Sequence, residues 1–189
     1  MIETQSSQLL PSLFTHFDPQ QRLHVLHLGP AMPETVDFFS GYRCKLFFVD
    51  LFAELPLVAE EDGPDLVQQL QGLLDFPEGT QFDICLCWDL FNFLDALAIS
   101  ALQQVLLPFL HSQSRVHGFA VHNPRVRPAE RTYAIRQQNE FVVRERVGNL
   151  PGYTGHGQGQ LQNLLSGFEF ERTVLRSDKR LEMLLNIKS

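Results

Sequence analysis

A glycine and an aspartate stand at a spacing that suits nucleotide binding. Gly29 ends the apolar run VLHLG, and Asp50 follows 21 residues later at the end of the apolar run KLFFVD. In nucleotide-binding folds, a carboxylate about 20 residues after a glycine turn accepts hydrogen bonds from the ribose hydroxyls. A vicinal diol can donate two charge-assisted bonds to such a group. The alternative is that Asp50 caps a helix beginning at DLFAEL.

Two further pairs of an acid and an aromatic residue are candidates for the same site. Asp75 and Phe76 come in the loop before the strand predicted at 82–88, and we expect them to hold an adenine amine and its ring face. Trp88 and Asp89 come at the end of that strand and are expected near the reactive group of a bound cofactor. Each pair has a plainer alternative, because Asp75 could cap a turn and Trp88 could be a core aromatic.

The order of the elements predicts a sheet that would position these residues. A strand at 22–28, a helix at 33–40 and a strand at 45–50 form a crossover unit, which implies parallel strands. The alternation continues with helices at 63–74 and 94–112 and strands at 82–88 and 115–123. Pro108 is expected to bend or end the longest helix early.

The second half of the chain breaks this alternation. A β-hairpin is predicted at 131–147, a short helix follows the loop 152–160, and two strands joined at RSDKR fill 168–188. The four glycines of 152–160 suit a mobile lid or a plain connector. The predicted class is therefore α/β, a Rossmann-like doubly wound and mostly parallel sheet with an inserted hairpin and an antiparallel C-terminal hairpin. Residues 1–189 are expected to form one domain, with 1–21 as an N-terminal helical extension.

Composition indicates a globular protein with an uneven charge distribution. The chain has 189 residues, of which 44% are hydrophobic and 20% charged, and no apolar run approaches a membrane span of about 18 residues. No secretory signal is recognisable, and a cytoplasmic location is expected. Residues 1–112 carry 3 basic and 15 acidic groups (−12), whereas 113–189 carry 12 basic and 7 acidic groups (+5).

The excess of arginine lies largely in and around the predicted hairpin. Such a cluster could bind phosphates or carboxylates, but a solvated face neutralised by the acidic half or by a neighbouring molecule is favoured. Nucleic acid is an unlikely partner, because no aromatic stacking pattern accompanies the charges.

The three cysteines favour packing over metal binding. Cys85 and Cys87 form a C-x-C pair that a strand would place on one face, and no histidine has a spacing that pairs with them. No metal site is therefore predicted, and the odd number of cysteines suits a reducing compartment.

Four runs of the chain form a recognisable series: VLHLGPAMPETVDFF, KLFFVDL, QFDICLCWDLFNFLD and GFEFERTVLRSDKRLEMLLNIK. Together they resemble the class I S-adenosylmethionine-dependent methyltransferases, over about residues 22–188. The resemblance implies that Gly29 lies under the cofactor, that Asp50 takes its ribose, and that Asp75 and Phe76 flank its adenine. It also implies that Trp88 and Asp89 face the substrate. The implied cofactor-binding set is His27, Gly29, Ala31, Asp50, Leu51, Asp75, Phe76, Trp88 and Asp89, and no catalytic residue is identified.

The glycine turn departs from the pattern of that family at three positions. His27 replaces an acid, and Ala31 and Pro33 replace glycines. A neutral imidazole does not attract the cofactor ammonium, a β-carbon limits close approach, and proline removes one N–H. If each change costs about 1 kcal/mol, affinity falls by a few hundredfold.

Two kinds of function remain open from the sequence. One is a methyltransferase that acts on a small-molecule or protein substrate, since methyl transfer needs mainly positioning and desolvation. The other is a non-catalytic scaffold that binds a protein partner, or forms a homodimer, through the Arg-rich hairpin 131–147. A dehydrogenase is disfavoured by the antiparallel terminal pair and by the absence of G-x-G-x-x-G.

Overall fold

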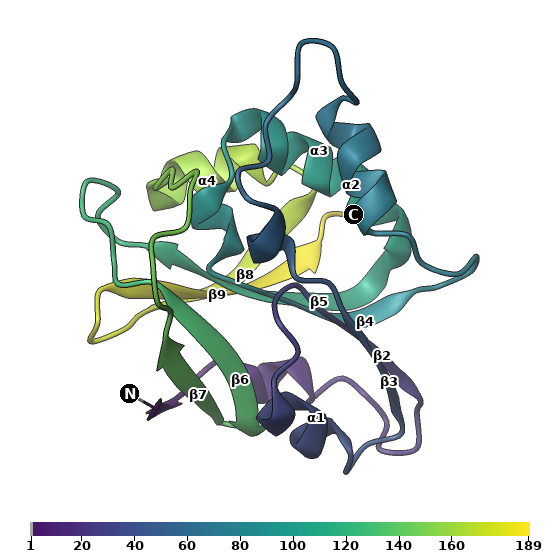
Figure 1. Ribbon diagram of the computed structural model, residues 1–189. Coiled ribbons are helices and arrows are strands. Elements are labelled where there is room, and N and C mark those ends of the chain that lie inside the picture. The colour runs from purple at the N-terminus through teal and green to yellow at the C-terminus, as the bar shows by residue number, and fades with distance from the viewer. Residues whose placement is uncertain (1) are drawn as a thin grey trace.

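A central six-stranded sheet carries a different layer on each face. The computed structural model describes residues 2–189, and Figure 1 shows the helices α2 (Leu66–Leu73), α3 (Ala96–Leu106) and α4 (Gln158–Leu164) on one face. The other face carries helix α1 (Pro33–Phe39) and a second, three-stranded sheet. None of the helices in the described part of the chain has the length and apolar character needed to cross a membrane.

The six-stranded sheet begins parallel and ends antiparallel. Its order is β3-β2-β4-β5-β9-β8. Adjacent strands among the first four are parallel, whereas β9 runs antiparallel to both β5 and β8. The strands are β2 (Leu23–His27), β3 (Cys44–Phe48), β4 (Phe82–Trp88), β5 (Leu110–Val121), β8 (Phe168–Leu175) and β9 (Arg180–Ile187). The predicted α/β class with a mostly parallel sheet is confirmed.

Alternate residues of β2 and β4 enter two separate hydrophobic clusters. Leu26, Cys85 and Cys87 join the cluster under α2, α3 and α4, while Val25 and Ile84 join the cluster on the α1 face. The two cysteines are free thiols whose sulfurs lie 3.7 Å apart, on one face of β4 as predicted. No group of side chains suited to a metal ion occurs within residues 2–189.

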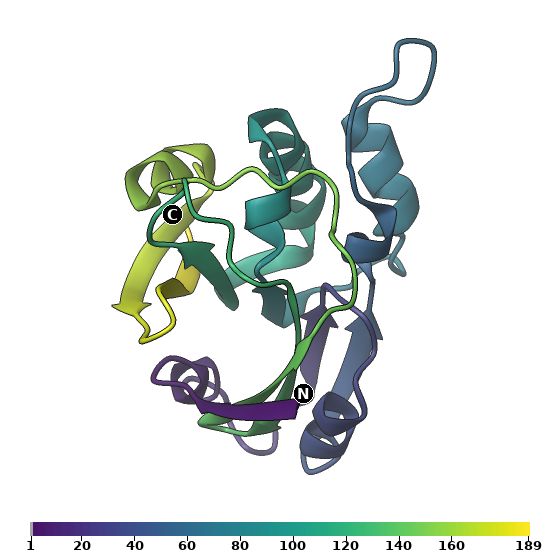
Figure 2. The same ribbon diagram turned by 60° about the vertical axis from the view of Figure 1, so that its left-hand side comes forward.

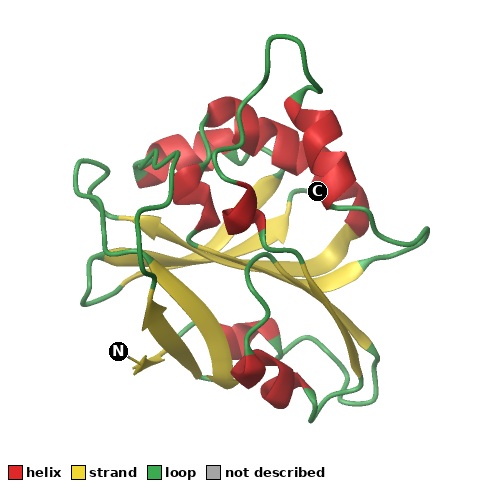
Figure 3. Ribbon diagram, in the orientation of Figure 1, coloured by secondary structure: helices red, strands yellow, loops and turns green. Residues whose placement is uncertain are grey.

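The second sheet contains the predicted hairpin and the start of the chain. Strands β6 (Arg131–Gln137) and β7 (Glu140–Glu145) form an antiparallel pair, and β1 (Ile2–Ser6) adds to β7, which gives the order β1-β7-β6. Figure 3 shows this small sheet in yellow beneath the larger one. The prediction of a helical extension over 1–21 is therefore wrong for Ile2–Ser6. Its polar sequence becomes a strand because β7 offers a ladder of hydrogen bonds, which local sequence does not reveal.

A short 3₁₀ helix, η1 (Leu10–Leu13), follows β1 and buries its leucines. The hydroxyl oxygen of Ser7 accepts hydrogen bonds from the backbone N–H groups of Leu9 (3.1 Å) and Leu10 (2.9 Å) before this turn. The N-terminal segment is thus part helix and part strand, and both parts pack against the main body of the fold.

The longest helix is shorter than the sequence predicts. Helix α3 ends at Leu106, and Leu107–Phe109 form a 3₁₀ turn that contains Pro108. Strand β5 then begins at Leu110, five residues before the predicted start. The expected effect of Pro108 is confirmed, because proline cannot donate the backbone hydrogen bond that would continue the helix.

Candidate functional site

The carboxyl ends of three neighbouring parallel strands lie at one edge of the sheet. His27, the last residue of β2, is in register with Phe48 of β3 and with Leu86 of β4. Gly29 and Asp50 each follow the end of their strand by two residues, and Asp89 follows β4 directly. The fold thus brings Gly29, Asp50 and Asp89 to one edge, which we call the carboxyl edge.

His27 is a buried hydrogen-bond acceptor. Its side chain is fully buried, and the loss of solvation lowers its pKa from 6.5 to about 3. The neutral ring accepts a hydrogen bond at Nε2 from the indole N–H of Trp88, at 3.1 Å. His27 thus makes a side-chain contact within the protein instead of offering charge to a ligand.

Trp88 lies in the core and not on the substrate side that the family resemblance implies. It is 1% exposed, and its ring stacks on Tyr133 of β6 with centroids 5.3 Å apart and an interplanar angle of 10°. Its backbone has φ 52°, a left-handed conformation that bulky residues rarely adopt. Gly118 of β5 accommodates the turn, since a Cβ there would lie 3.1 Å from the Trp88 carbonyl oxygen.

Asp89 is a buried carboxyl group beside the same stack. Its Oδ2 accepts a hydrogen bond from the hydroxyl of Tyr133 at 3.3 Å, and its Oδ1 has no partner within the described residues. Burial raises the pKa of Asp89 from 3.8 to about 6, against the opposing charges of Arg180 and Arg146. Its titration midpoint therefore lies near pH 6, below neutral pH.

The space beside Gly29 is filled by side chains of the protein. A Cβ added to Gly29 would lie 3.2 Å from Nε2 of His27 and 3.6 Å from Cδ1 of Trp88. The glycine itself is buried, whereas Ala31 in the same turn is exposed. Pro33 occupies the first position of α1. A backbone N–H at this position would have no partner within the helix, so proline loses no helical hydrogen bond there. The turn thus accommodates the rings of His27 and Trp88.

Asp50 retains an unpaired oxygen, as a ligand-binding carboxylate would. It precedes the 3₁₀ helix η2 (Leu51–Glu54) but makes no side-chain capping bond to it. Its Oδ1 is buried and has no hydrogen-bond partner in the described chain. Leu51 is fully buried in the core, so its side chain is not available to a ligand at this edge.

The glycine-rich segment 148–157 crosses the carboxyl edge and is hydrogen-bonded to the residues that follow β4. The backbone N–H of Thr154 donates to the carbonyl of Asn92 at 2.7 Å, and Nε2 of His156 lies 2.7 Å from the carbonyl oxygen of Leu94. Tyr153 packs edge-on against Phe93 at 5.8 Å. Figure 2 shows the segment passing from the hairpin across the molecule to α4.

Asp75 and Phe76 lie at the opposite edge, and their predicted place beside the cofactor is wrong. The ring of Phe76 packs against Phe82, the first residue of β4, at 4.8 Å and against Phe109 at 5.1 Å. Asp75 is exposed. The loop leads into β4, so it must reach the amino end of that strand, whereas Gly29 follows the carboxyl end of β2.

The arginines of the hairpin are used within the chain. Arg144 pairs with Glu34 of α1, Arg131 lies 3.2 Å from Asp178, and Arg136 lies 3.7 Å from Glu140. The backbone N–H of Ile135 also donates to the hydroxyl of Thr35 in α1, at 3.1 Å. These contacts fix the hairpin on α1 and on the turn between β8 and β9.

Three side chains near this edge were not identified from the sequence. The guanidinium of Arg180 donates a hydrogen bond to the hydroxyl of Tyr133, which in turn donates to Asp89. The third residue is Arg146, whose guanidinium lies over the ring of Phe52 at 5.3 Å. Tyr133 and Ile135, two residues apart in β6, both enter the cluster on the α1 face, but nothing local indicates that Tyr133 stacks on Trp88. Its partner comes from a strand 45 residues earlier.

Comparison with known proteins identifies the fold. No protein-family model and no curated protein matches the sequence. Among solved structures, the chain is similar to the PH0226 protein from Pyrococcus horikoshii OT3, with a TM-score of 0.56 and 12% identity over 95% of this chain and 88% of that one. It is also similar to the glycopeptide N-methyltransferase MtfA complexed with S-adenosyl-L-methionine, with a TM-score of 0.52 and 12% identity over 95% and 92% of the two chains.

A third similar structure is the pyocyanin biosynthetic protein PhzM, with a TM-score of 0.52 and 14% identity. The match covers 95% of this chain but only 54% of PhzM, so the chain spans about half the length of that relative. These identities are too low to transfer an activity, and the likeness concerns architecture. The chain has the fold of the class I S-adenosylmethionine-dependent methyltransferases.

Proposed function

We propose that this chain is a non-catalytic binding protein built on the methyltransferase fold. The observation that carries the proposal is the hydrogen bond from Trp88 to His27 beside Gly29, with Tyr133 stacked on the indole. In this arrangement the rings of His27 and Trp88 occupy the space on the Cβ side of Gly29, in the turn that the resemblance places under the cofactor. Two of the side chains that the resemblance assigns to the cofactor, His27 and Trp88, bond to each other instead.

The residues at the carboxyl edge do not fit S-adenosylmethionine well. Asp50, with its unpaired oxygen, suits the ribose. The neutral His27 does not attract the ammonium group, and the backbone beside Gly29 is already in contact with two rings. Asp75 and Phe76 are at the wrong edge to flank the adenine. We therefore derive no chemical step through this cofactor.

Calorimetric titration of the purified chain with S-adenosylmethionine and S-adenosylhomocysteine tests the proposal. We expect no binding heat at millimolar ligand. Micromolar binding that Asp50→Ala abolishes and Asp75→Ala leaves unchanged would contradict it. Asp75→Ala is the matched control because its carboxylate is exposed at the opposite edge.

The binding surface that we favour is the outer sheet of β1, β7 and β6, with a second copy of the chain as its occupant. Strand β1 is an edge of that sheet, and such edges pair readily with other strands. Two apolar side chains are exposed near it, with Ile2 66% and Val147 100% accessible. An isologous contact would bury both residues in each copy.

Sedimentation velocity across a concentration series tests this surface. Val147→Asp should weaken self-association at least tenfold, while Val58→Asp, in the remote loop between η2 and α2, should not. Val58 is a suitable control because it is also exposed, at 51%. A monomer at all concentrations, or equal effects of the two variants, would refute the dimer.

The second candidate is a methyltransferase, and a different observation favours it. Three buried acceptor atoms have no hydrogen-bond partner in the described residues, namely the Oδ1 atoms of Asp50, Asp89 and Asn92. Hydroxyl and ammonium donors of an adenosyl cofactor would satisfy such atoms, as would water. The calorimetric experiment decides between the two candidates, because only this second one requires Asp50-dependent binding.

A further inference from the structure

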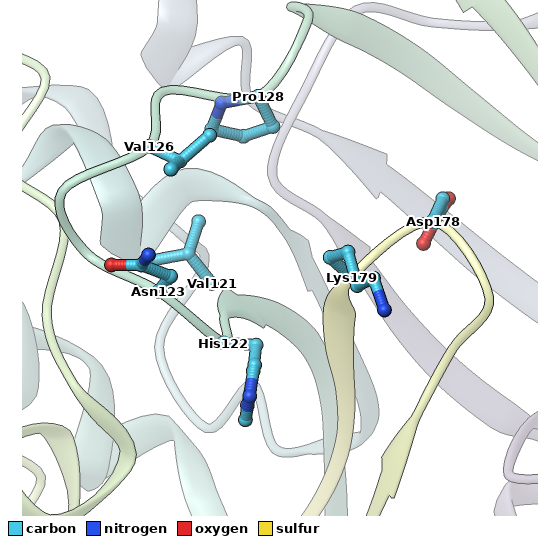
Figure 4. A pocket seen from close by; sticks show the side chains of 7 residues that line it. All are labelled: Val121, His122, Asn123, Val126, Pro128, Asp178 and Lys179. Carbon is cyan, nitrogen blue, oxygen red and sulfur yellow. The ribbon is translucent and has the colours of Figure 1, made fainter.

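A cavity lies at the carboxyl end of β5 and shares no lining residue with the turn at Gly29. It has a volume of about 380 Å³ and is lined by Val121, His122, Asn123, Val126, Pro128, Asp178 and Lys179. Figure 4 shows that these residues come from two places, the segment that follows β5 and the turn between β8 and β9. A volume of this size is within the range of small-molecule sites, about 300–1,000 Å³.

The two walls of the cavity are fixed to each other. The backbone N–H of His122 donates to the carbonyl oxygen of Lys179 at 3.2 Å, which extends the pairing of β5 with β9 by one residue. On the wall that carries His122, the Oδ1 of Asn123 accepts a hydrogen bond from the backbone N–H of Arg125 at 3.0 Å.

The lining holds one acidic and one basic side chain, Asp178 and Lys179, and only the acidic one has ion-pair partners within the described residues. Asp178 is held by Arg180 through its Nε at 2.9 Å and by Arg131 at 3.2 Å. Burial alone would raise the pKa of Asp178, but the hydrogen bond and charge of Arg180 lower it. Lys179, by contrast, forms none of the ion pairs found within residues 2–189.

The remaining surface of the cavity is apolar. Val126 is 59% exposed, and Pro128 lies two residues further along the same segment. Val121 is buried and completes this side. An apolar surface facing one unpaired ammonium group is complementary to a ligand with a hydrophobic body and a single anionic group.

We propose that this cavity is a binding site for small carboxylates with an apolar, ring-sized body. Lys179 binds the carboxylate, and Val126 and Pro128 pack against the body of the ligand. None of its lining residues belongs to the turn at Gly29, so the proposal does not require a nucleotide cofactor to bind there.

Titration of the ¹⁵N-labelled full chain with benzoate, followed by two-dimensional NMR, tests the proposal. Benzoate should shift the amide signals of residues 121–128 and 178–179 in a saturable manner. Benzamide, the neutral isostere, should bind at least fivefold more weakly, as expected when a charge-assisted hydrogen bond is lost.

Substitutions of lysine supply the matched controls. Lys179→Gln should weaken benzoate binding about tenfold, and Lys179→Arg should restore it. Lys188→Gln removes the same charge from an exposed position near the C-terminus and should change nothing. Equal affinity for benzoate and benzamide, equal effects of the two glutamine variants, or shifts spread over the whole surface would overturn the assignment.

Discussion

The burial of Asp89 predicts an unusual dependence of stability on pH. Its pKa is about 6 in the folded chain against 3.8 for an exposed group, so the folded state binds this proton more tightly than the unfolded state. Its contribution to stability is complete below pH 3.8 and is lost as the pH rises through 6. The difference of 6 − 3.8, about 2.2 pKa units, corresponds to a loss of about 3 kcal/mol.

His27 acts in the opposite direction over the same range. Its pKa falls from 6.5 to about 3 on folding, so its contribution is complete above pH 6.5 and is lost as the pH falls towards 3. Between about pH 4 and 6 the two slopes have opposite signs and similar size. The wild-type profile alone therefore does not reveal either group, and a variant is needed.

Asp89→Asn isolates the contribution of Asp89. Asparagine keeps an acceptor for the hydroxyl of Tyr133 and removes the titration. Urea unfolding at pH 4 and pH 8 should show that the variant gains up to about 3 kcal/mol relative to wild type between the two values. Glu78→Gln, at an exposed position before β4, is the control and should give no pH-dependent difference. A constant difference between wild type and Asp89→Asn at both pH values would refute the reasoning.

Three further variants test the packing around the site. Trp88→Phe leaves Nε2 of His27 buried without its donor and should cost about 1–3 kcal/mol in urea unfolding; an unchanged midpoint would mean that the bond at 3.1 Å contributes nothing. Arg144→Ala should cost less than about 1 kcal/mol, because its pair with Glu34 is partly exposed, and a double-mutant cycle measures the coupling. Gly152→Ala should lower the melting temperature, because φ at this residue is 80° and the new Cβ would lie 3.2 Å from the carbonyl oxygen of Phe93. Gly159→Ala in α4, where nothing lies near the new Cβ, is the control and should not lower it.

The elements that alternate along the chain were predictable because their signals are local. The buried run of β4 and the crossover around α1 fix parallel strands, and the short turn before β9 fixes an antiparallel end. The same reasoning brought Gly29 and Asp50 to one edge. It failed for Asp75 and Phe76, because a loop that precedes a strand lies at the opposite edge from a loop that follows one.

The polar strand β1 marks a second limit of prediction. Nothing in IETQS favours a strand until β7 lies beside it, since a strand is stabilised by its partner and not by its own hydrogen bonds.

The sequence by itself determined the order of the strands and helices from residue 22 onwards, the face on which Cys85 and Cys87 lie, and the identity of the groups at the carboxyl edge. The tertiary structure alone decided what those groups contact. Trp88 meets Tyr133 and His27 because three strands distant in sequence converge there, and burial then sets the protonation of His27 and Asp89. Solvation depends on every atom that surrounds a group, and most of those atoms belong to residues far away along the chain.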